Sequence, residues 1–340
     1  MSGNKIKFGV IGCGHIGKRH AEMITRNADC ELVALCDVLP KEKLGLGAYP
    51  NVPFFPSVEA MLSSGIDMDV VSVCSPNGLH ATHALNVLEA KKHVVCEKPM
   101  ALKKSNCEEV IHKSMQVHRQ VFCVMQNRYS PPAEWLKELI ESKKLGDIYM
   151  VQLNCYWNRD DRYYKAGTWK GKKDMDGGVL FTQFSHFIDM MYWLFGDIDK
   201  VKAHFFNFNH QKTTEFDDSG VVSFHFTKQG MGCINFSTSV WDTNFESSLT
   251  IIGEKGTVKV GGQYMDKIEY CHIKDYTMPT LAPTNPANDY GSYKGSAANH
   301  HYIIENVVKT LKGDSSVTTN ALEGMKVVDM IERIYAAKKK

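Results

Sequence analysis

The chain has 340 residues, 40 of them Lys or Arg and 38 of them Asp or Glu, which leaves a formal net charge of +2. This length exceeds what one hydrophobic core usually serves, so we expect two domains. The near balance of charge argues against a nucleic-acid partner, and the one basic run, lysines 338–340, is typical of a solvated helix end.

Ten cysteines are scattered along the chain without a C-x-x-C pair, several of them in apolar segments that resemble buried strands. They are typical of core residues in a reduced protein, so we expect neither disulfides nor a metal site. No segment approaches the roughly 18 apolar residues of a membrane span, and the first residues lead into a strand without the apolar stretch of a signal peptide. We therefore expect a soluble, cytoplasmic protein with no membrane partner.

The N-terminal part of the chain alternates short apolar segments with segments of helical periodicity. This alternation predicts βαβ units and a doubly wound parallel sheet, that is, an α/β Rossmann domain over residues 1–124. The predicted strands are KFGVIG, ELVALC, VVSVC, HVVCE and VFCVM, and the predicted helices cover residues 15–26, 57–63, 79–90 and 104–117.

The pattern changes after Asn127, where longer strands of alternating polarity follow one helix at 131–142. Alternation of this kind is typical of an antiparallel sheet with one buried face, so residues 125–340 are predicted to form an α+β domain with an open, mostly antiparallel sheet. Helices are expected at 182–195 and, at the C-terminal end, 321–337, and a long loop at 278–296.

A G-x-G-x-x-G sequence, Gly12 to Gly17, lies directly between the first strand and the first helix. In this setting Gly12 makes the tight turn, Gly14 lets a pyrophosphate approach the backbone, and Gly17 lets the helix pack closely. The second strand ends at Asp37, where a carboxylate accepts hydrogen bonds from the adenosine ribose hydroxyls. Because Val38 follows instead of an arginine, the sequence predicts NAD in preference to NADP.

Two further motifs, Cys96-Glu97-Lys98-Pro99 and the segment 177–189 (GGVLFTQFSHFID), accompany the glycine loop. Together they resemble the glucose-fructose oxidoreductase, inositol dehydrogenase and rhizopine-catabolism (Gfo/Idh/MocA) superfamily of sugar dehydrogenases over the whole chain. The resemblance implies a homodimer or homotetramer formed through the antiparallel sheet. It also implies an NAD site that comprises Gly12, Gly14, His15, Ile16, Gly17, Asp37, Ser75, Pro76, Asn77, His80, Glu97 and Lys98.

Within this superfamily, the stretch from Arg159 to Gly171 is most similar to enzymes that oxidise C3 of a UDP-linked N-acetylglucosaminuronic acid. The resemblance implies a nucleotide-sugar substrate and, in such enzymes, 2-oxoglutarate can regenerate NAD in place. This stretch contains arginines and aromatic side chains. Arginines can bind a carboxylate or a diphosphate, and aromatic rings can stack on a uracil. The expected substrate contacts are Lys98, Arg128, Arg159, Tyr163, Tyr164, Trp169, Lys170, Thr182 and His186, with Arg162 and Lys165 in the same segment.

Hydride transfer from a secondary alcohol needs a base for the hydroxyl proton and a donor that steadies the alkoxide. The resemblance points to Lys98 and His186. A lysine starts near pKa ~10.4 and a histidine near ~6.5, so His186 is the less costly base and Lys98 is expected to remain the cationic donor. Many superfamily members have an aspartate where this chain has Thr182, which leaves the usual Asp-His partnership open. Asp189 either orients the imidazole or is solvated.

Two alternatives remain open at this stage. One is a dehydrogenase of a free sugar, glycoside or polyol, and the other is an NAD-binding sensor without activity. Arg128 contacts the cofactor or substrate, or else forms an interdomain salt bridge.

Overall fold

The computed structural model describes residues 5–291 and 293–338, so residues 1–4 of the predicted first domain and lysines 339 and 340 lie outside the described part. The chain forms two compact units. The first comprises Met1–Met125 and His300–Val328, and the second comprises Gln126–Asn299 and Asp329–Lys340.

A six-stranded sheet with the order β3-β2-β1-β4-β5-β6 forms the centre of the first unit, and each neighbouring pair is parallel. This confirms the predicted doubly wound sheet. The chain moves outward from β1 in both directions, so the carboxyl ends of β1 and β4 meet at the point where ligands of such sheets bind. The strands are β1 Ile6–Ile11, β2 Cys30–Cys36, β3 Phe54–Phe55, β4 Val70–Val73, β5 His93–Cys96 and β6 Val121–Cys123.

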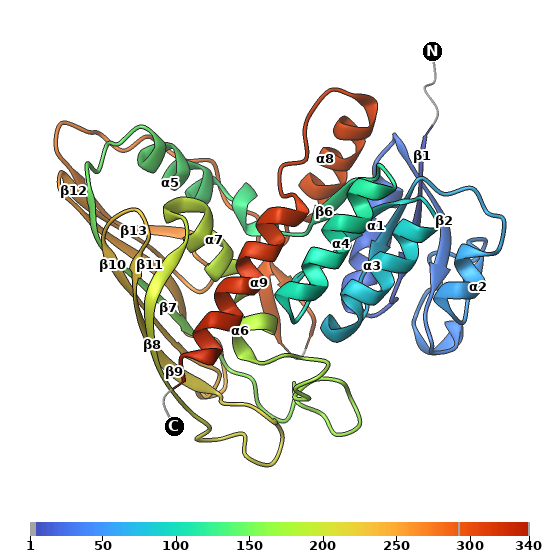
Figure 1. Ribbon diagram of the computed structural model, residues 1–340, viewed down its shortest axis with the longest axis horizontal. Helices are drawn as coiled ribbons and strands as arrows, with labels where there is room; N and C mark the ends of the chain where they lie inside the picture. Colours follow the sequence, from blue (N-terminus) through green and yellow to red (C-terminus); the bar gives the residue numbers. More distant parts are fainter. Residues whose placement is uncertain (1–4, 292, 339–340) are drawn as a thin grey trace. The chain divides into compact units, whose positions relative to one another are not determined.

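Residues 300–328 belong to the first unit, although the sequence analysis places them in the second domain. Helix α8 packs against α1 (Figure 1). The backbone N–H of Cys123 donates to the carbonyl of Thr319 at 2.9 Å, which ties the segment after α8 to the end of β6. A chain return of this kind leaves no local signal in the sequence. The helices of this unit are α1 His15–Arg26, α2 Val58–Leu62, α3 His80–Glu89, α4 Lys104–Gln116 and α8 His300–Lys312.

The second unit contains a seven-stranded sheet with the order β13-β12-β11-β7-β10-β9-β8. Only the β10–β7 pair is parallel, so the predicted mostly antiparallel sheet is confirmed. Burial alternates along β8, β9 and β10, so one face of the sheet lies in the core and the other is open. The strands are β7 Ile148–Tyr156, β8 Ile198–Phe206, β9 Ser219–Phe226, β10 Met231–Ser237, β11 Glu246–Gly253, β12 Gly256–Gly261 and β13 Lys267–Ile273.

The helix predicted at 182–195 corresponds to α7 Ser185–Phe195, and a separate short helix, α6 Val179–Thr182, precedes it (Figure 1). The chain breaks at Gln183 and Phe184, where the Gln183 side chain is held by Arg159 and Tyr163 at 2.8 Å each. These side-chain bonds come from residues distant in sequence, so helical periodicity does not reveal them. Thr182 and His186 therefore lie on successive helices and not on one helix face.

The remaining helices of this unit are α5 Pro131–Glu141 and the C-terminal end of α9 Ala321–Ala336, which begins in the first unit. The predicted loop at 278–296 contains part of a small hairpin, β14 Ala287–Asp289 with β15 Lys294–Ala297. Within the described ranges, no disulfide joins the cysteines, and none of the helices is both long and apolar enough to cross a membrane.

Candidate active site

The glycine loop has the geometry that a dinucleotide requires. Gly12 has φ +85°, and a Cβ on Gly17 would lie 1.7 Å from the carbonyl oxygen of Gly12, so neither position accepts a side chain without strain. A Cβ on Gly14, in contrast, would meet no atom within 4 Å, so space is open where a pyrophosphate approaches the backbone. No side chain caps the first turn of α1, which starts with His15 and Ile16, and its positive end faces that space.

Asp37 stands at the carboxyl end of β2, beside this loop. Its Oδ2 accepts the backbone N–H of Cys13 at 2.7 Å, and its Oδ1 accepts the N–H of Leu39 at 2.9 Å. A carboxylate has about four acceptor positions, so it can also accept ribose hydroxyls. Val38 is 87% exposed and brings no positive charge for a 2′-phosphate. These residues fit NAD.

His80 holds together the two loops that follow β4 and β5. One ring nitrogen lies 2.7 Å from the carbonyl oxygen of Ser75, and the other lies 2.7 Å from that of Pro99. Burial lowers the pKa of His80, and these two hydrogen bonds oppose the shift. Since both ring nitrogens are engaged, His80 links the two loops, and its place in the NAD site stays a prediction. Pro76 is half-buried, and Asn77 is buried at the start of the following turn.

Glu97 and Lys98 follow β5. The Glu97 carboxylate is 4% exposed and hydrogen-bonds with His20 at 3.0 Å and with the backbone N–H of Lys98 at 3.2 Å. The carboxylate therefore points into the first unit, and a contact between Glu97 and the cofactor stays a prediction. Lys98 is half-buried, at the carboxyl edge of the sheet.

In the second unit, His186 occupies the first turn of α7 and is 2% exposed. Thr182 ends α6, and its hydroxyl hydrogen-bonds with both the carboxyl Oδ1 and the backbone carbonyl of Asp176, the latter at 2.8 Å. Asp176 is fully buried and also accepts the N–H of Gly171 at 2.9 Å. Burial raises the pKa of Asp176 to about 6, against the opposing effect of these hydrogen bonds. A carboxyl group that titrates near neutrality therefore adjoins Thr182, which the sequence analysis did not anticipate.

Arg128 and Asp189 form a buried ion pair within the second unit. The Nη2–Oδ1 distance is 2.6 Å, the Nε–Oδ2 distance is 2.9 Å, and both side chains are nearly inaccessible. Breaking such a pair by removing one partner costs about 3–5 kcal/mol, because the other charge stays buried. Asp189 is thus not a solvated residue, and Arg128 does not form an interdomain bridge with it.

Arg159 is an unusual charged residue in this unit. It is 2% exposed, and among the described residues its guanidinium hydrogen-bonds only with neutral groups. It packs on the rings of Trp157 at 4.7 Å and Tyr163 at 5.0 Å. The ammonium of Lys170 lies 3.8 Å from the centroid of the Tyr163 ring. Burial and the charge of Arg159 lower the pKa of Lys170 to about 8. Tyr293 contacts both cations, and we call Arg159, Lys170, Tyr163 and Tyr293 the cationic cluster.

The other predicted substrate residues differ in placement. Tyr164 is buried, and its ring lies edge-on to Tyr163 and His210. Neither face of the ring is therefore exposed for stacking with a uracil. Trp169 is half-buried in the same loop, whereas Arg162 is exposed and pairs with Asp160 at 2.7 Å.

Several residues of the site have no motif in the sequence. Tyr293 lies 134 positions after Arg159, and His20 and His300 are separated by most of the chain. The one local signal was the mixture of cationic and aromatic residues in the segment that begins at Arg159.

A cleft of about 880 Å³ adjoins the cationic cluster at the edge of the second sheet. Tyr264 and Lys294 line it, and both also contact Asn244, which accepts a hydrogen bond from Arg159 at 3.1 Å. Lysines and carboxylates line the cleft together, and the exposed ring of Phe245 adds an apolar surface.

Comparisons with known proteins give consistent results. Residues 6–124 match the model of the oxidoreductase family with an NAD-binding Rossmann fold, and residues 134–259 match the GFO/IDH/MocA C-terminal domain. The WlbA dehydrogenase from Bordetella pertussis, solved with NADH and UDP-GlcNAcA, is 32% identical, with a TM-score of 0.87 and coverage of 98% of this chain and 96% of that chain.

Two relatives act on other substrates by name. The D-glucoside 3-dehydrogenase of Escherichia coli K12 is 30% identical over 210 residues, which cover 61% of this chain and 59% of that protein. The inositol 2-dehydrogenase of Rhizobium meliloti is 25% identical over 282 residues, which cover 81% of this chain and 82% of that protein.

Proposed function

Because this chain belongs to the Gfo/Idh/MocA family of NAD-dependent sugar oxidoreductases, we propose that it oxidises a secondary ring hydroxyl of an anionic nucleotide sugar. More specifically, we propose that the substrate is a UDP-N-acetylglucosaminuronic acid and that its C3 hydroxyl is oxidised. The WlbA dehydrogenase, solved with UDP-GlcNAcA, is similar to this chain over nearly its full length, and this similarity supports the proposed substrate.

The observation that carries the proposal is the cationic cluster. A buried guanidinium without a carboxylate partner is costly, because the loss of hydration is not repaid by an opposite charge. Arg159 is such a guanidinium, beside the Tyr163 ring. The half-buried ammonium of Lys170, which also interacts with the Asp176 carboxylate, lies beside the same ring. An anion that binds there gains charge-assisted hydrogen bonds from the fork of the arginine, and a sugar carboxylate or a diphosphate has the matching geometry.

The reaction requires groups that manage the proton and the developing charge. When bound, NAD supplies the acceptor for the hydride. We assign to His186 the removal of the hydroxyl proton, and to Lys98 a cationic hydrogen bond that steadies the alkoxide oxygen. The Asp176 carboxyl, which accepts a hydrogen bond from Thr182, gives the second unit a further proton-holding group at the end of α6.

The alternative substrate is a neutral glycoside or polyol, which the names of the glucoside and inositol relatives favour. Such a substrate carries no charge for Arg159 and Lys170 to bind. Calorimetry distinguishes the two: UDP-N-acetylglucosaminuronate, UDP, methyl glucoside and myo-inositol are each titrated into the NAD-loaded enzyme.

We expect the anionic sugar to bind, and Arg159→Met or Lys170→Met to weaken it at least ~10-fold, since a charge-assisted hydrogen bond contributes about 1.5–3 kcal/mol. Lys172→Met serves as the matched control, because Lys172 is exposed in the same loop. Binding of only the neutral ligands, with no effect of either substitution, would favour the alternative.

We also propose that the enzyme is a homodimer or homotetramer and that the open face of the second sheet is the contact with another copy. Phe206, Val221, Met231 and Tyr270 are 60%, 56%, 47% and 52% exposed on this sheet. The molar mass of the wild type and of Val221→Glu, measured by light scattering, tests this proposal. We expect an oligomeric wild type and a variant of lower mass, and a monomeric wild type would refute the proposal.

A further inference from the structure

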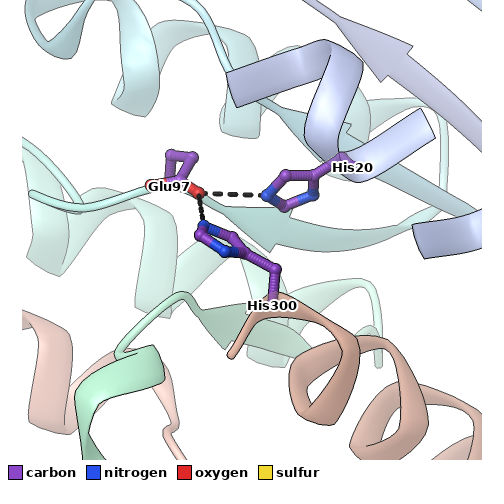
Figure 2. A group of neighbouring side chains, drawn as sticks. All are labelled: His20, Glu97 and His300. Carbon is purple, nitrogen blue, oxygen red and sulfur yellow. Dashed lines mark hydrogen bonds and ion pairs between the residues drawn. The ribbon is translucent and has the colours of Figure 1, made fainter. Parts of the chain in front are cut away.

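A buried trio of side chains in the first unit joins three distant parts of the sequence (Figure 2). His20 lies on α1, behind the glycine loop; Glu97 follows β5; and His300 begins α8. The Oε1 atom of Glu97 lies 3.0 Å from Nε2 of His20 and 3.5 Å from Nε2 of His300. The three side chains are between 1% and 5% exposed.

The pKa of this carboxyl group is lowered although the group is buried. Burial acts to raise the pKa of Glu97, but the hydrogen bonds and charges of His20 and His300 outweigh it and hold the pKa well below its usual value. Burial lowers the pKa of His300, and the neighbouring Glu97 carboxylate opposes this shift. The hydrogen bond with His20 and the nearby His300 ring thus replace the water that would surround a surface carboxylate.

The second oxygen of the same carboxylate connects the trio to Lys98. Oε2 of Glu97 accepts the backbone N–H of Lys98 at 3.2 Å. On the other side of Lys98, the carbonyl of Pro99 is held by the His80 ring at 2.7 Å. Both neighbours of Lys98 are therefore fixed by buried hydrogen bonds, so its backbone has little freedom to shift. A displacement of about 1 Å at a reacting group costs as much as 10²-fold in rate.

We propose that Glu97, held by His20 and His300, is a positioning residue of the dehydrogenase reaction that acts through Lys98. The inference deepens the proposed function, since it rests on the role assigned to Lys98 there. It predicts that α1, β5 and α8 must all be in place before Lys98 is correctly held. Substitutions in the trio should therefore lower kcat and not only the stability of the fold.

The trio also has three atoms of the kind that bind a metal, all within 4.8 Å of one another. A metal ion would have to displace the hydrogen bond between His20 and Oε1 of Glu97. Zinc sites in proteins use three or four protein ligands at 2.0–2.2 Å, and the described residues offer only these three here. The hydrogen-bonded carboxylate already accounts for the arrangement.

The test is a double-mutant cycle between Glu97 and Lys98, with the sugar that the calorimetric panel selects. Glu97→Gln keeps the shape of the side chain but removes its charge and places an amide N–H against a donor. We expect kcat to fall about 10- to 100-fold in the wild-type background. In the Lys98→Met background, the same substitution should change the residual kcat by less than about twofold, because an effect exerted through Lys98 is already lost.

Thermal unfolding and NAD affinity are measured in both backgrounds, since a purely structural role would lower them in both alike. Glu31→Gln is the control, because Glu31 is exposed on β2 in the same unit. If Glu97→Gln does not fold, His20→Gln and His20→Leu replace it: the glutamine keeps an N–H donor and should restore most of the turnover that the leucine loses.

The outcomes separate the two proposals. A Glu97→Gln enzyme with kcat within about twofold of wild type, alongside an impaired Lys98→Met enzyme, would overturn the positioning role and leave the function of Lys98 intact. Full activity of Lys98→Met would overturn both. Stoichiometric metal in the purified enzyme, absent from His20→Leu by elemental analysis, would also overturn the positioning role in favour of a metal site.

Discussion

Asp176 provides a test of the electrostatics of the second unit through the pH dependence of stability. Its carboxyl is fully buried, and burial raises its pKa from 3.8 to about 6. Between these two pH values the folded state keeps a proton that the unfolded state has released. The stabilisation from this proton is therefore complete below pH 3.8 and is lost as the pH rises through about 6.

The size of the effect follows from the shift. Two pKa units at ~1.4 kcal/mol each give about 3 kcal/mol in total, of which about 2 kcal/mol is lost between about pH 4.5 and about pH 7.5. Asp176→Asn cannot ionise, so its stability lacks this component. The altered hydrogen bonds with Thr182 and Gly171 add an offset that does not depend on pH.

The assay is denaturant unfolding of the wild type and Asp176→Asn at several pH values, followed by tryptophan fluorescence. Groups that do not interact with Asp176 cancel in the difference between the two proteins. Lys170 does interact with Asp176, but its pKa of about 8 lies above the pH range compared. We expect the free energy of unfolding of the wild type, relative to the variant, to fall by about 2 kcal/mol from about pH 4.5 to about pH 7.5. A difference that is flat, or that rises with pH, would refute the assignment of a proton to the buried Asp176.

Three further predictions concern the cofactor, the cationic cluster and the base. The wild type should have a higher kcat/KM with NAD than with NADP, and Asp37→Ala should lower the ratio of these two values. Equal kcat/KM values for the two cofactors in the wild type would contradict the role of Asp37. The affinity for an anionic sugar should decline as the pH rises through about 8, where Lys170 loses its charge, and Lys170→Met should show no such decline in calorimetry. His186→Asn should lower kcat by about 10²–10⁴-fold with little change in NAD affinity, and near-normal turnover would assign the base elsewhere.

Features that depend on neighbouring residues could be predicted from the sequence. The turn at Gly12, the close approach at Gly17 and the carboxylate at Asp37 follow from the order of strand, loop and helix, and the structure has each in its expected form. The parallel and antiparallel sheets follow in the same way from the two kinds of alternation.

Features that depend on residues distant in the sequence could not be predicted from the sequence. The break between α6 and α7 arises because Gln183 bonds with Arg159 and Tyr163, and periodicity alone predicts one continuous helix. The return of residues 300–328 to the first unit brings His300 to Glu97, from positions 203 residues apart in the sequence. Glu97 was recognised by its motif, but its partners are set by tertiary packing.

The central claim, oxidation of an anionic nucleotide sugar, is tested most directly by initial rates of NADH formation. UDP-N-acetylglucosaminuronate, methyl glucoside and myo-inositol are compared at matched NAD concentration, and the position of the ketone in the product is identified by NMR. Buried cations left unpaired by a neutral sugar should discriminate strongly, so we predict a kcat/KM at least roughly 100-fold higher for the anionic sugar and a ketone at C3. A higher kcat/KM for the glucoside or for inositol would contradict the claim.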